Sequence, residues 1–206
     1  MEELIVKKAK DLFFSYGLKS VSMDDVAKNA GVSKKTIYKC FDDKNQLVQR
    51  LVSDLLSCHK QGLEQCREGA KDAIDEVLLF SQTPFNTVAV INPGFFYELK
   101  KFFPVVHRLI ADHTQHVLIP SIIKNLEKGI EQELYRNDID LLFTAEVRVQ
   151  QILTAHNPKT FTDRILQSNK LMLQLSEFYL HGIVTQKGKK LINKYLNVNN
   201  ENQFSN

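Results

Sequence analysis

The sequence has no tryptophan, only three cysteines and no long hydrophobic run. The cysteines are odd in number and none forms a Cys-x-x-Cys pair, so we expect no disulfide framework. The longest uncharged stretch, residues 77–97, contains two prolines, a glycine and several polar side chains, whereas a membrane-spanning helix needs about 20 predominantly apolar residues. The amino terminus is charged throughout and lacks the apolar segment of a signal peptide. These absences predict a cytoplasmic, reduced protein with no membrane partner.

The sequence also lacks the motifs that mark a catalytic site. There is no nucleophile–base pair, no glycine-rich phosphate loop, no Glu-x-x-His motif and no cluster of acids placed for catalysis. His113 and His116 are spaced so that they share a helix face, two turns after His107, but no carboxylate or thiol pattern supports a metal site around them. We therefore expect neither an enzyme nor a cofactor or metal.

The positive charge is concentrated at one end of the chain. The formal net charge is +3, and residues 1–50 hold ten basic and seven acidic residues, which leaves 17 of each in the remainder. All of the excess charge therefore lies in the first quarter of the sequence. Such an asymmetry favours a nucleic-acid partner for that segment.

Residues 22–47, SMDDVAKNAGVSKKTIYKCFDDKNQL, predict two short helices joined by a tight turn. Ser22 stands in the N-cap position of the first helix, with Asp25 three residues later in the capping-box position. Gly31 supplies the permissive backbone of the turn, and Ser33 caps the second helix. This arrangement is typical of a helix-turn-helix, whose second helix enters the DNA major groove.

The second of these helices, residues 34–40, has cations and no acids. Ile37 and Phe41 are spaced to point inward, which leaves the other side chains of the helix for a partner. We expect the DNA-facing set to be Lys34, Lys35, Thr36, Tyr38 and Lys39. Lysines hold phosphates, whereas base edges are read mostly by Arg, Asn and Gln, none of which occurs between Ser33 and Phe41. Binding should therefore depend strongly on salt.

Helical periodicity continues through the rest of the chain, so we predict an all-α fold. The expected helices cover residues 3–16, 44–69, 71–81, 95–103, 104–134, 138–155 with Asp138 as N-cap, 162–184 and 189–196. Pro120 should kink the helix at 104–134 or divide it in two. The only β-branched run is residues 87–91. The expected domains are a helix-turn-helix domain at 1–46, a helical effector-binding and dimerisation body at 47–197 and a disordered tail at 198–206.

Two segments of the body suggest roles. Apolar residues cover roughly 240° of the wheel of the helix at 162–184, more than one buried face requires, so this helix and the one at 138–155 could pair two chains. We predict a dimer interface at Leu166, Leu173, Tyr179, Leu180 and Ile183. An aromatic cluster around the uncharged stretch favours a mostly apolar ligand pocket. Its candidate residues are Phe80, Phe85, Phe95, Phe96, Phe102, Phe103 and His107.

Residues 9–47 resemble the TetR family of bacterial transcriptional regulators. The matching features are Phe-x-x-x-Gly at the end of the first helix, the Ser-x-x-Asp cap, Ala-Gly-Val-Ser, Thr-Ile-Tyr and Phe-x-x-Lys-x-x-Leu. The resemblance implies a homodimer that binds a near-palindromic double-stranded operator and is released, as a repressor, by a small effector. It also implies phosphate contacts from Ser22 and Lys44. The full expected DNA-binding set is Ser22, Ser33, Lys34, Lys35, Thr36, Tyr38, Lys39 and Lys44.

One residue departs from the family pattern, and one alternative function stays open. Many members of the family have histidine where this chain has Cys40, and a thiol is a poor reader of bases. Cys40, beside Lys39, could also serve as a redox sensor, although a small packed side chain is the simpler interpretation. The alternative is a DNA-binding architectural or cell-division protein of the same fold that has no small-molecule effector.

Overall fold

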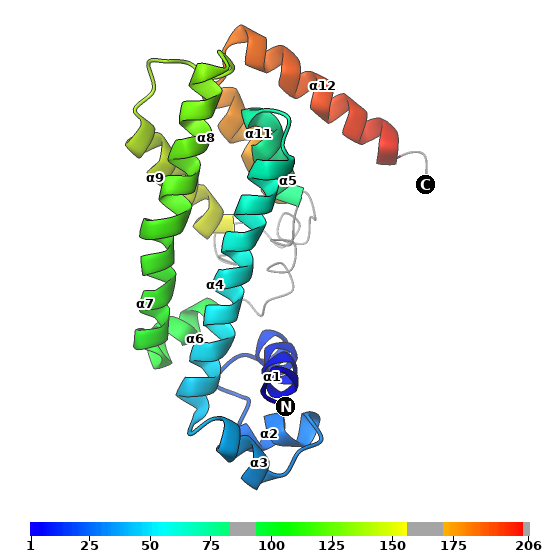
Figure 1. Cartoon of the computed structure of the whole chain (residues 1–206), viewed down its shortest axis with the longest axis vertical. Helices are drawn as coiled ribbons and strands as arrows, with labels where there is room; N and C mark the ends of the chain where they lie inside the picture. Colours follow the sequence, from blue (N-terminus) through cyan, green and yellow to red (C-terminus); the bar gives the residue numbers. More distant parts are fainter. Residues whose placement is uncertain (83–93, 156–170, 204–206) are drawn as a thin grey trace. The chain divides into compact units, whose positions relative to one another are not determined.

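The computed structural model describes residues 1–82, 94–155 and 171–203, and these residues form helices with no strand among them. The predicted all-α class is confirmed. In chain order the elements are α1 (Glu2–Tyr16), α2 (Met23–Asn29), α3 (Lys34–Cys40), α4 (Lys44–Gly69), α5 (Ala73–Gln82), α6 (Phe95–Phe102), α7 (Pro104–His113), the π-helical turn η2 (Thr114–Leu118), α8 (Ile119–Glu131), α9 (Leu141–Ala155), α11 (Leu171–Ile183) and α12 (Gln186–Gln203) (Figure 1).

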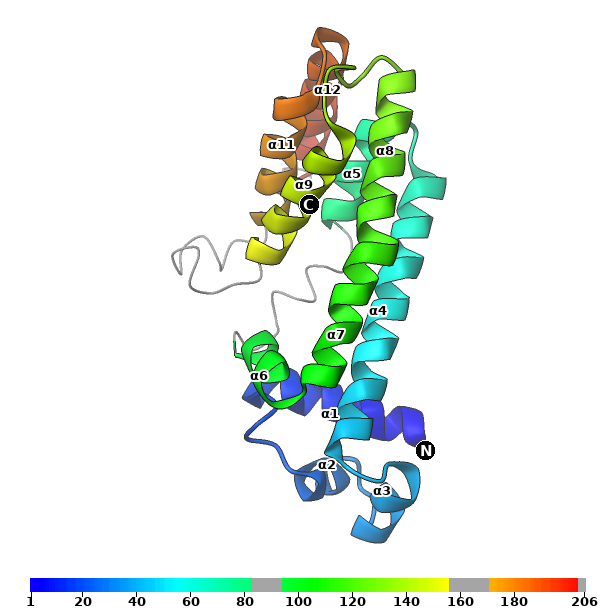
Figure 2. The same cartoon turned by 90° about the vertical axis from the view of Figure 1, so that its left-hand side faces the viewer.

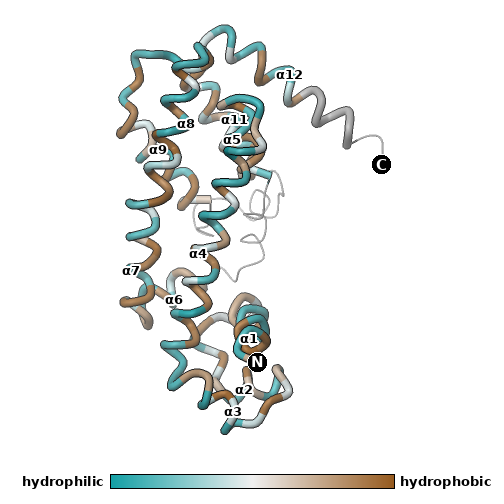
Figure 3. The backbone as a smooth tube through the Cα atoms, in the orientation of Figure 1, coloured by the Kyte–Doolittle hydropathy of each residue, from teal (hydrophilic) through white to brown (hydrophobic). Residues whose placement is uncertain are grey.

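The helices are amphipathic. Hydrophobic and hydrophilic residues alternate along them (Figure 3), and most of the large apolar side chains are buried. Within the ranges that the structure describes, no helix combines the length and the apolar character needed to cross a membrane.

The chain divides into two compact units, residues 1–59 with 90–113 and residues 60–89 with 114–206. The predicted domain boundary between residues 46 and 47 lies inside α4 and inside the first unit. The helix-turn-helix segment at residues 1–46 is therefore only part of a larger compact unit, which also contains α6 and α7.

The core of the first unit joins α1 to the helices around it. Ile5, Ala9 and Phe13 follow the helical repeat and are fully buried. The ring of Phe14 meets that of Phe95 in α6 edge-on, with centroids 5.2 Å apart. The apolar residues of α2 and α3 belong to the same core, so both helices are packed against this part of the first unit.

In the second unit, α5, α8, α9 and α11 surround a common core (Figure 2). Leu126 and Leu180 are fully buried in it. The hydroxyl of Tyr135 lies 2.9 Å from the carbonyl oxygen of Ala73 and 3.1 Å from Oδ1 of Asn125. Burial holds the pKa of Tyr135 well above its ordinary value, so this side chain stays a neutral donor that ties α5 to α8.

The helix predicted at 104–134 is divided near Pro120, which was one of the two predicted outcomes. The π-helical turn at Thr114–Leu118 separates α7 from α8, and Pro120 lies in the first turn of α8, where its missing N–H is tolerated. Two other predicted helix limits in the body were wrong. The N-cap of α9 is Asp140, whose Oδ1 accepts the N–H of Phe143 at 2.9 Å, whereas Asp138 pairs with Arg136.

The second difference is at the carboxyl end of the chain. There, α12 begins at Gln186 and reaches Gln203, into the segment that the sequence predicted to be a disordered tail. The β-branched run at 87–91 and the first part of the predicted helix at 162–184 lie outside the described residues.

Gly129 in α8 offers a test of the packing in the second unit. A Cβ at this position would come within 2.0 Å of Cδ2 of Tyr135, whose ring is held by the hydrogen bonds above. We expect Gly129→Ala to lower the free energy of unfolding by about 1–3 kcal/mol, as overpacked cores do. Thermal unfolding followed by circular dichroism measures the effect as a lower Tm.

Gly62 in α4 provides the matched control. Apart from the backbone of its own helix turn and its chain neighbours, no atom of the described residues lies within 4 Å of the position that a Cβ would take at Gly62. Alanine is favoured over glycine inside a helix by about 1 kcal/mol. Gly62→Ala should therefore raise the Tm. A Gly129→Ala protein as stable as the original would contradict the packing described here.

Candidate nucleic-acid interface and ligand cavity

The first helix of the helix-turn-helix starts with a complete capping box. The N–H of Asp25 donates to Oγ of Ser22 at 3.2 Å, and the N–H of Ser22 donates to Oδ2 of Asp25 at 2.8 Å. The turn that follows contains Gly31 at a φ of 67°, a conformation that side chains disfavour. At the start of α3, Oγ of Ser33 accepts the N–H of Thr36 at 3.0 Å. Local hydrogen bonds therefore set the start of both helices.

The capping box makes stability depend on pH. The pKa of Asp25 is lowered chiefly by the hydroxyl of Ser22 and also by its backbone N–H. A lowered folded-state pKa stabilises the protein above the ordinary value of 3.8, and this contribution is lost as the pH falls through the lowered pKa. We expect Ser22→Ala to raise the pKa of Asp25, as measured by carboxyl NMR titration. Ser33→Ala is the control and should leave that titration unchanged.

The outer face of α3 carries the residues that the sequence predicted to face DNA. Lys34, Lys35 and Lys39 are exposed, and the side chain of Tyr38 is 43% exposed. Ile37, by contrast, is fully buried. The exposed and buried sides of α3 are thus those that the helical spacing predicts.

Lys34 has a partner within the helix-turn-helix. Its Nζ donates to Oδ2 of Asp24 in α2 at 2.9 Å, and this contact raises the pKa of Lys34. Both side chains are largely exposed, so the ion pair contributes little to stability. The ammonium group can exchange Asp24 for a phosphate at small cost.

Lys44 is placed differently from the lysines of α3. Its ammonium group donates to the carbonyl oxygens of Leu18 and Val21 and lies 5.6 Å from the centroid of the Phe13 ring. Burial lowers the pKa of Lys44. In this structure the side chain ties the start of α4 to the segment between α1 and α2, so the predicted phosphate contact competes with these bonds.

The second unit contains a cavity between α4, α5, α8, α9 and α11. The space within it that a water-sized sphere can reach is ≈ 50 Å³, and the hollow around that space opens to solvent. Apolar side chains form much of its wall, among them Leu63, Phe80, Leu118 and Ile122. The polar residues of the wall include Arg67, Glu76, Asn125, Arg148 and Tyr179.

Most of the predicted pocket residues lie elsewhere. Phe80 lines the cavity, and Phe85 is outside the described residues. The others belong to the first unit, because α6 and the start of α7 pack onto α1 and complete its core. This correction applies to Phe95, Phe96, Phe102, Phe103 and His107. Phe95 is 1% exposed, and Phe102 is 41% exposed to solvent.

The structure places most of the predicted dimer residues inside the core of a single chain, and their role in a dimer stays a prediction. Tyr179, Leu180 and Ile183 are buried inside the second unit of a single chain. Leu173 packs against the same core, and Leu166 is outside the described residues. The sequence correctly predicted a wide apolar face on the helix at 162–184, but in the described part of that helix the residues named here already pack inside a single chain. Of these residues, Tyr179 lines the cavity instead.

Sequence reasoning missed Arg148, although a signal for it exists. The buried face of α9 carries Ala145, Val149 and Ile152 at helical spacing, and Arg148 occupies the position between the first two. A cation on an otherwise apolar face is unusual. That pattern alone could have marked this position as functional.

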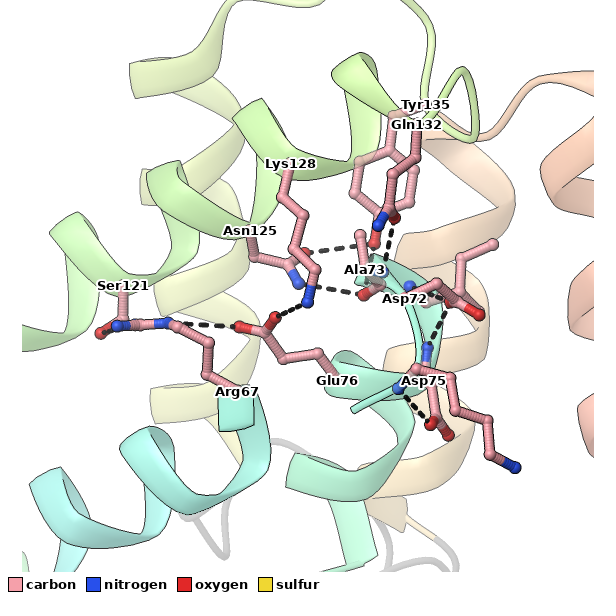
Figure 4. A network of polar contacts seen from close by, with 12 residues as sticks. Arg67, Asp72, Ala73, Asp75, Glu76, Ser121, Asn125, Lys128, Gln132 and Tyr135 are labelled. Carbon is pink, nitrogen blue, oxygen red and sulfur yellow. Dashed lines mark hydrogen bonds and ion pairs between the residues drawn. The ribbon is translucent and has the colours of Figure 1, made fainter. Parts of the chain in front are cut away.

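The polar side of the cavity wall is an ordered network (Figure 4). Oε2 of Glu76 accepts from Nζ of Lys128 at 3.1 Å, and its Oε1 lies 3.7 Å from Nε of Arg67. Nη2 of Arg67 donates to Oγ of Ser121 at 3.2 Å. Glu76 is thus neutralised by two cations.

The structure defines a class of protein: an all-helical chain with an amino-terminal helix-turn-helix and a helical body that contains a cavity. Comparisons with known proteins support this class. Residues 5–51 match the family model of bacterial regulatory proteins, tetR family. The chain is 26% identical over 132 residues to the uncharacterized HTH-type transcriptional regulator YhgD of Bacillus subtilis, across 63% of this chain and 69% of that protein.

Solved structures share the fold. Reduced NemR of E. coli has a TM-score of 0.72 at 17% identity, with 89% of this chain and 97% of that chain covered. SCO4454 of Streptomyces coelicolor, a TetR-family regulator, has a TM-score of 0.69 at 18% identity, with 88% and 94% covered. Residues 5–51 therefore match the DNA-binding domain of this family, and the chain shares the overall fold of these solved regulators.

Proposed function

We propose that this protein is a homodimeric repressor that binds a near-palindromic operator and is released by a small effector. The observation that carries the proposal is the outer face of α3, where Lys34, Lys35, Tyr38 and Lys39 are exposed on a helix whose start is capped. Such a helix fits the major groove, and a dimer presents two of them to half-sites about one turn of DNA apart.

The dimer would form through apolar residues that a single chain leaves exposed. On α9, Leu142, Phe143 and Val147 are 54%, 65% and 39% exposed, and on α11 Phe178 is 74% exposed. Phe143 and Val147 lie on the side of α9 opposite its buried side, which contains Ala145, Val149 and Ile152, and Leu142 lies at the edge of that buried side. A helix that is apolar on two sides needs a second partner, and a two-fold axis supplies one from an identical chain.

The effector would bind in the cavity of the second unit. Because α4 contributes residues to both units, a ligand that prefers one conformation of the second unit can bias the first through that helix. The ligand would then shift the population towards dimers whose recognition helices no longer fit both half-sites. This is the mechanism that we favour for release.

Selection of bound sequences from random double-stranded DNA, with the purified full-length protein, tests this function. The expected product is an inverted repeat whose half-sites are about one helical turn apart. Recovery of no preferred sequence would count against an operator-specific repressor. Release of the selected operator by a small molecule supports the effector, and an operator complex that responds to no effector indicates the alternative architectural role.

A further inference from the structure

Arg148 is a buried cation without an acidic partner among the described residues. It is 3% exposed. Its Nη1 lies 3.2 Å from the carbonyl oxygen of Leu175 and 3.3 Å from Oε1 of Gln151, and its Nη2 donates to Oγ of Ser176 at 2.5 Å. All three acceptors are neutral. Burial lowers the pKa of Arg148 to about 10, so the guanidinium is still charged at neutral pH.

Such an arrangement is costly for the protein alone. Buried charges in proteins are normally paired with an opposite charge or bound to a ligand. The one carboxylate in the described cavity wall, Glu76, is already paired with Lys128 and lies near Arg67. Glu76 carries one negative charge and faces two cations, so this network already has an excess of positive charge. Arg148 differs from those cations because no acidic side chain among the described residues contacts it.

Tyr179 provides a second, independent sign of a missing ligand. The residue is only 6% exposed, and its buried hydroxyl has no hydrogen-bond partner within the described ranges. Its ring centroid lies 4.9 Å from Cζ of Arg148, and both residues line the cavity. An unsatisfied buried hydroxyl is as unfavourable as a lost hydrogen bond.

We propose that the effector of this regulator is an organic monocarboxylate with an apolar body, whose carboxylate binds Arg148 and the hydroxyl of Tyr179. The inference rests on the proposed function, in that it assigns the effector to this cavity. The guanidinium fork matches the two oxygens of a carboxylate, and the apolar wall formed by Leu63, Phe80 and Ile122 suits a hydrocarbon body. A phosphate monoester carries close to two negative charges, whereas a carboxylate matches the single charge of Arg148, the cation of the wall that no acidic side chain contacts.

Binding is tested on the full-length protein without DNA, by calorimetry and thermal shift. The probes are straight-chain acids from butanoate to hexadecanoate, phenylpropanoate, and the primary amide and alkyl phosphate of each body. We expect at least one acid to bind about 10-fold to 100-fold more tightly than its amide, the effect of a charged hydrogen-bonding group. If no acid binds more tightly than its amide, the proposal is wrong, and tighter binding of the phosphates would assign the site to phosphates.

Two substitutions separate the ligand role of Arg148 from a structural one. Arg148→Met keeps much of the side-chain volume and should abolish the preference for acid over amide, while raising the Tm of the ligand-free protein because an unpaired charge is removed. Arg148→Lys keeps a cation and should retain part of the preference. Tyr179→Phe should weaken acid binding several-fold without lowering the ligand-free Tm. Acid binding to Arg148→Met equal to that of the original protein would overturn the proposal.

Two control variants complete the experiment. Arg50→Met removes an exposed arginine of the first unit that pairs with Asp54, and it should leave acid binding unchanged. Segments 83–93, 156–170 and 204–206 lie outside the described residues, and Asp163 is the only acidic residue in them. The variant Asp163→Asn tests whether that carboxylate pairs with Arg148. Unchanged stability and acid binding support a ligand as the partner, whereas loss of both would assign the pairing to Asp163 and contradict the proposal.

Operator release is measured separately, by fluorescence anisotropy. If an acid binds through Arg148 but the operator complex persists, the ligand site stands and the proposed effector-controlled release fails. If a neutral compound releases the operator and no acid binds, the regulatory function stands and the carboxylate assignment fails.

Discussion

Alanine at Lys34, Lys35 and Tyr38 together should weaken operator binding by at least about 100-fold while leaving the dimer folded. The side chains are exposed on α3, so their removal leaves no cavity in the core. Each charged contact with DNA contributes about 1.5–3 kcal/mol, and two lost lysines already account for this change. Because each phosphate contact releases counterions, the slope of log K against log salt should fall by about 2 for each recognition helix. Fluorescence anisotropy across a salt series measures both quantities.

The control for this variant replaces two exposed lysines of α12, Lys189 and Lys190, with alanine. It also removes two positive charges, so it accounts for the effect of net charge alone. We expect its affinity and its salt slope to stay close to those of the original protein. Equal losses in the two variants would show that general electrostatic attraction, rather than the α3 face, holds the DNA.

Glutamate at Phe143 and Phe178 together should convert the dimer into a folded monomer and weaken binding to a full operator by at least about 100-fold. Both rings are largely exposed in a single chain, at 65% and 74%, so the substitutions remove nothing from its core. Two-fold symmetry repeats each substitution on the second chain, which places four carboxylates in an apolar interface where charge is strongly unfavourable. A monomer also contacts only one half-site of the operator, which weakens binding further. Sedimentation equilibrium measures the association, and anisotropy measures the operator affinity.

Tyr97→Glu is the matched control for the dimer variant. Tyr97 is an aromatic residue of α6 with 65% exposure, so it tests what an added surface carboxylate does away from α9 and α11. This variant should remain a dimer. A Phe143→Glu, Phe178→Glu protein that sediments as a dimer would rule out the proposed interface.

The amino-terminal quarter was highly predictable because its signals are local. Ser22, Asp25, Gly31 and Ser33 act on backbone groups within four residues of themselves, so their positions in the sequence determine where α2 and α3 begin and end. The limits of α3 and α4 are those predicted, and the exposed side of α3 follows from the buried position of Ile37.

Sequence spacing did not predict which elements surround the candidate ligand and dimer residues, because those surroundings are not local. Helical periodicity shows that Phe95 and Leu180 are buried, but it does not show which element covers them. Phe95 packs on α1 rather than around a ligand, and Leu180 is covered by its own chain. A more useful signal is a residue whose type does not match its surroundings. Arg148 is charged among buried apolar residues, and Phe178 is apolar among exposed polar ones.

In the proposed dimer, the two apolar sides of α9 would make folding and pairing of this protein depend on each other. One side packs in the chain's own core, whereas Phe143 and its apolar neighbours are exposed in a single chain, and the partner chain would cover them. Pairing therefore adds to the stability of each chain by mass action, and this contribution grows with protein concentration. A cell with few copies would hold them in their least stable form, so the abundance of the regulator would set its own lifetime as well as the occupancy of its operator.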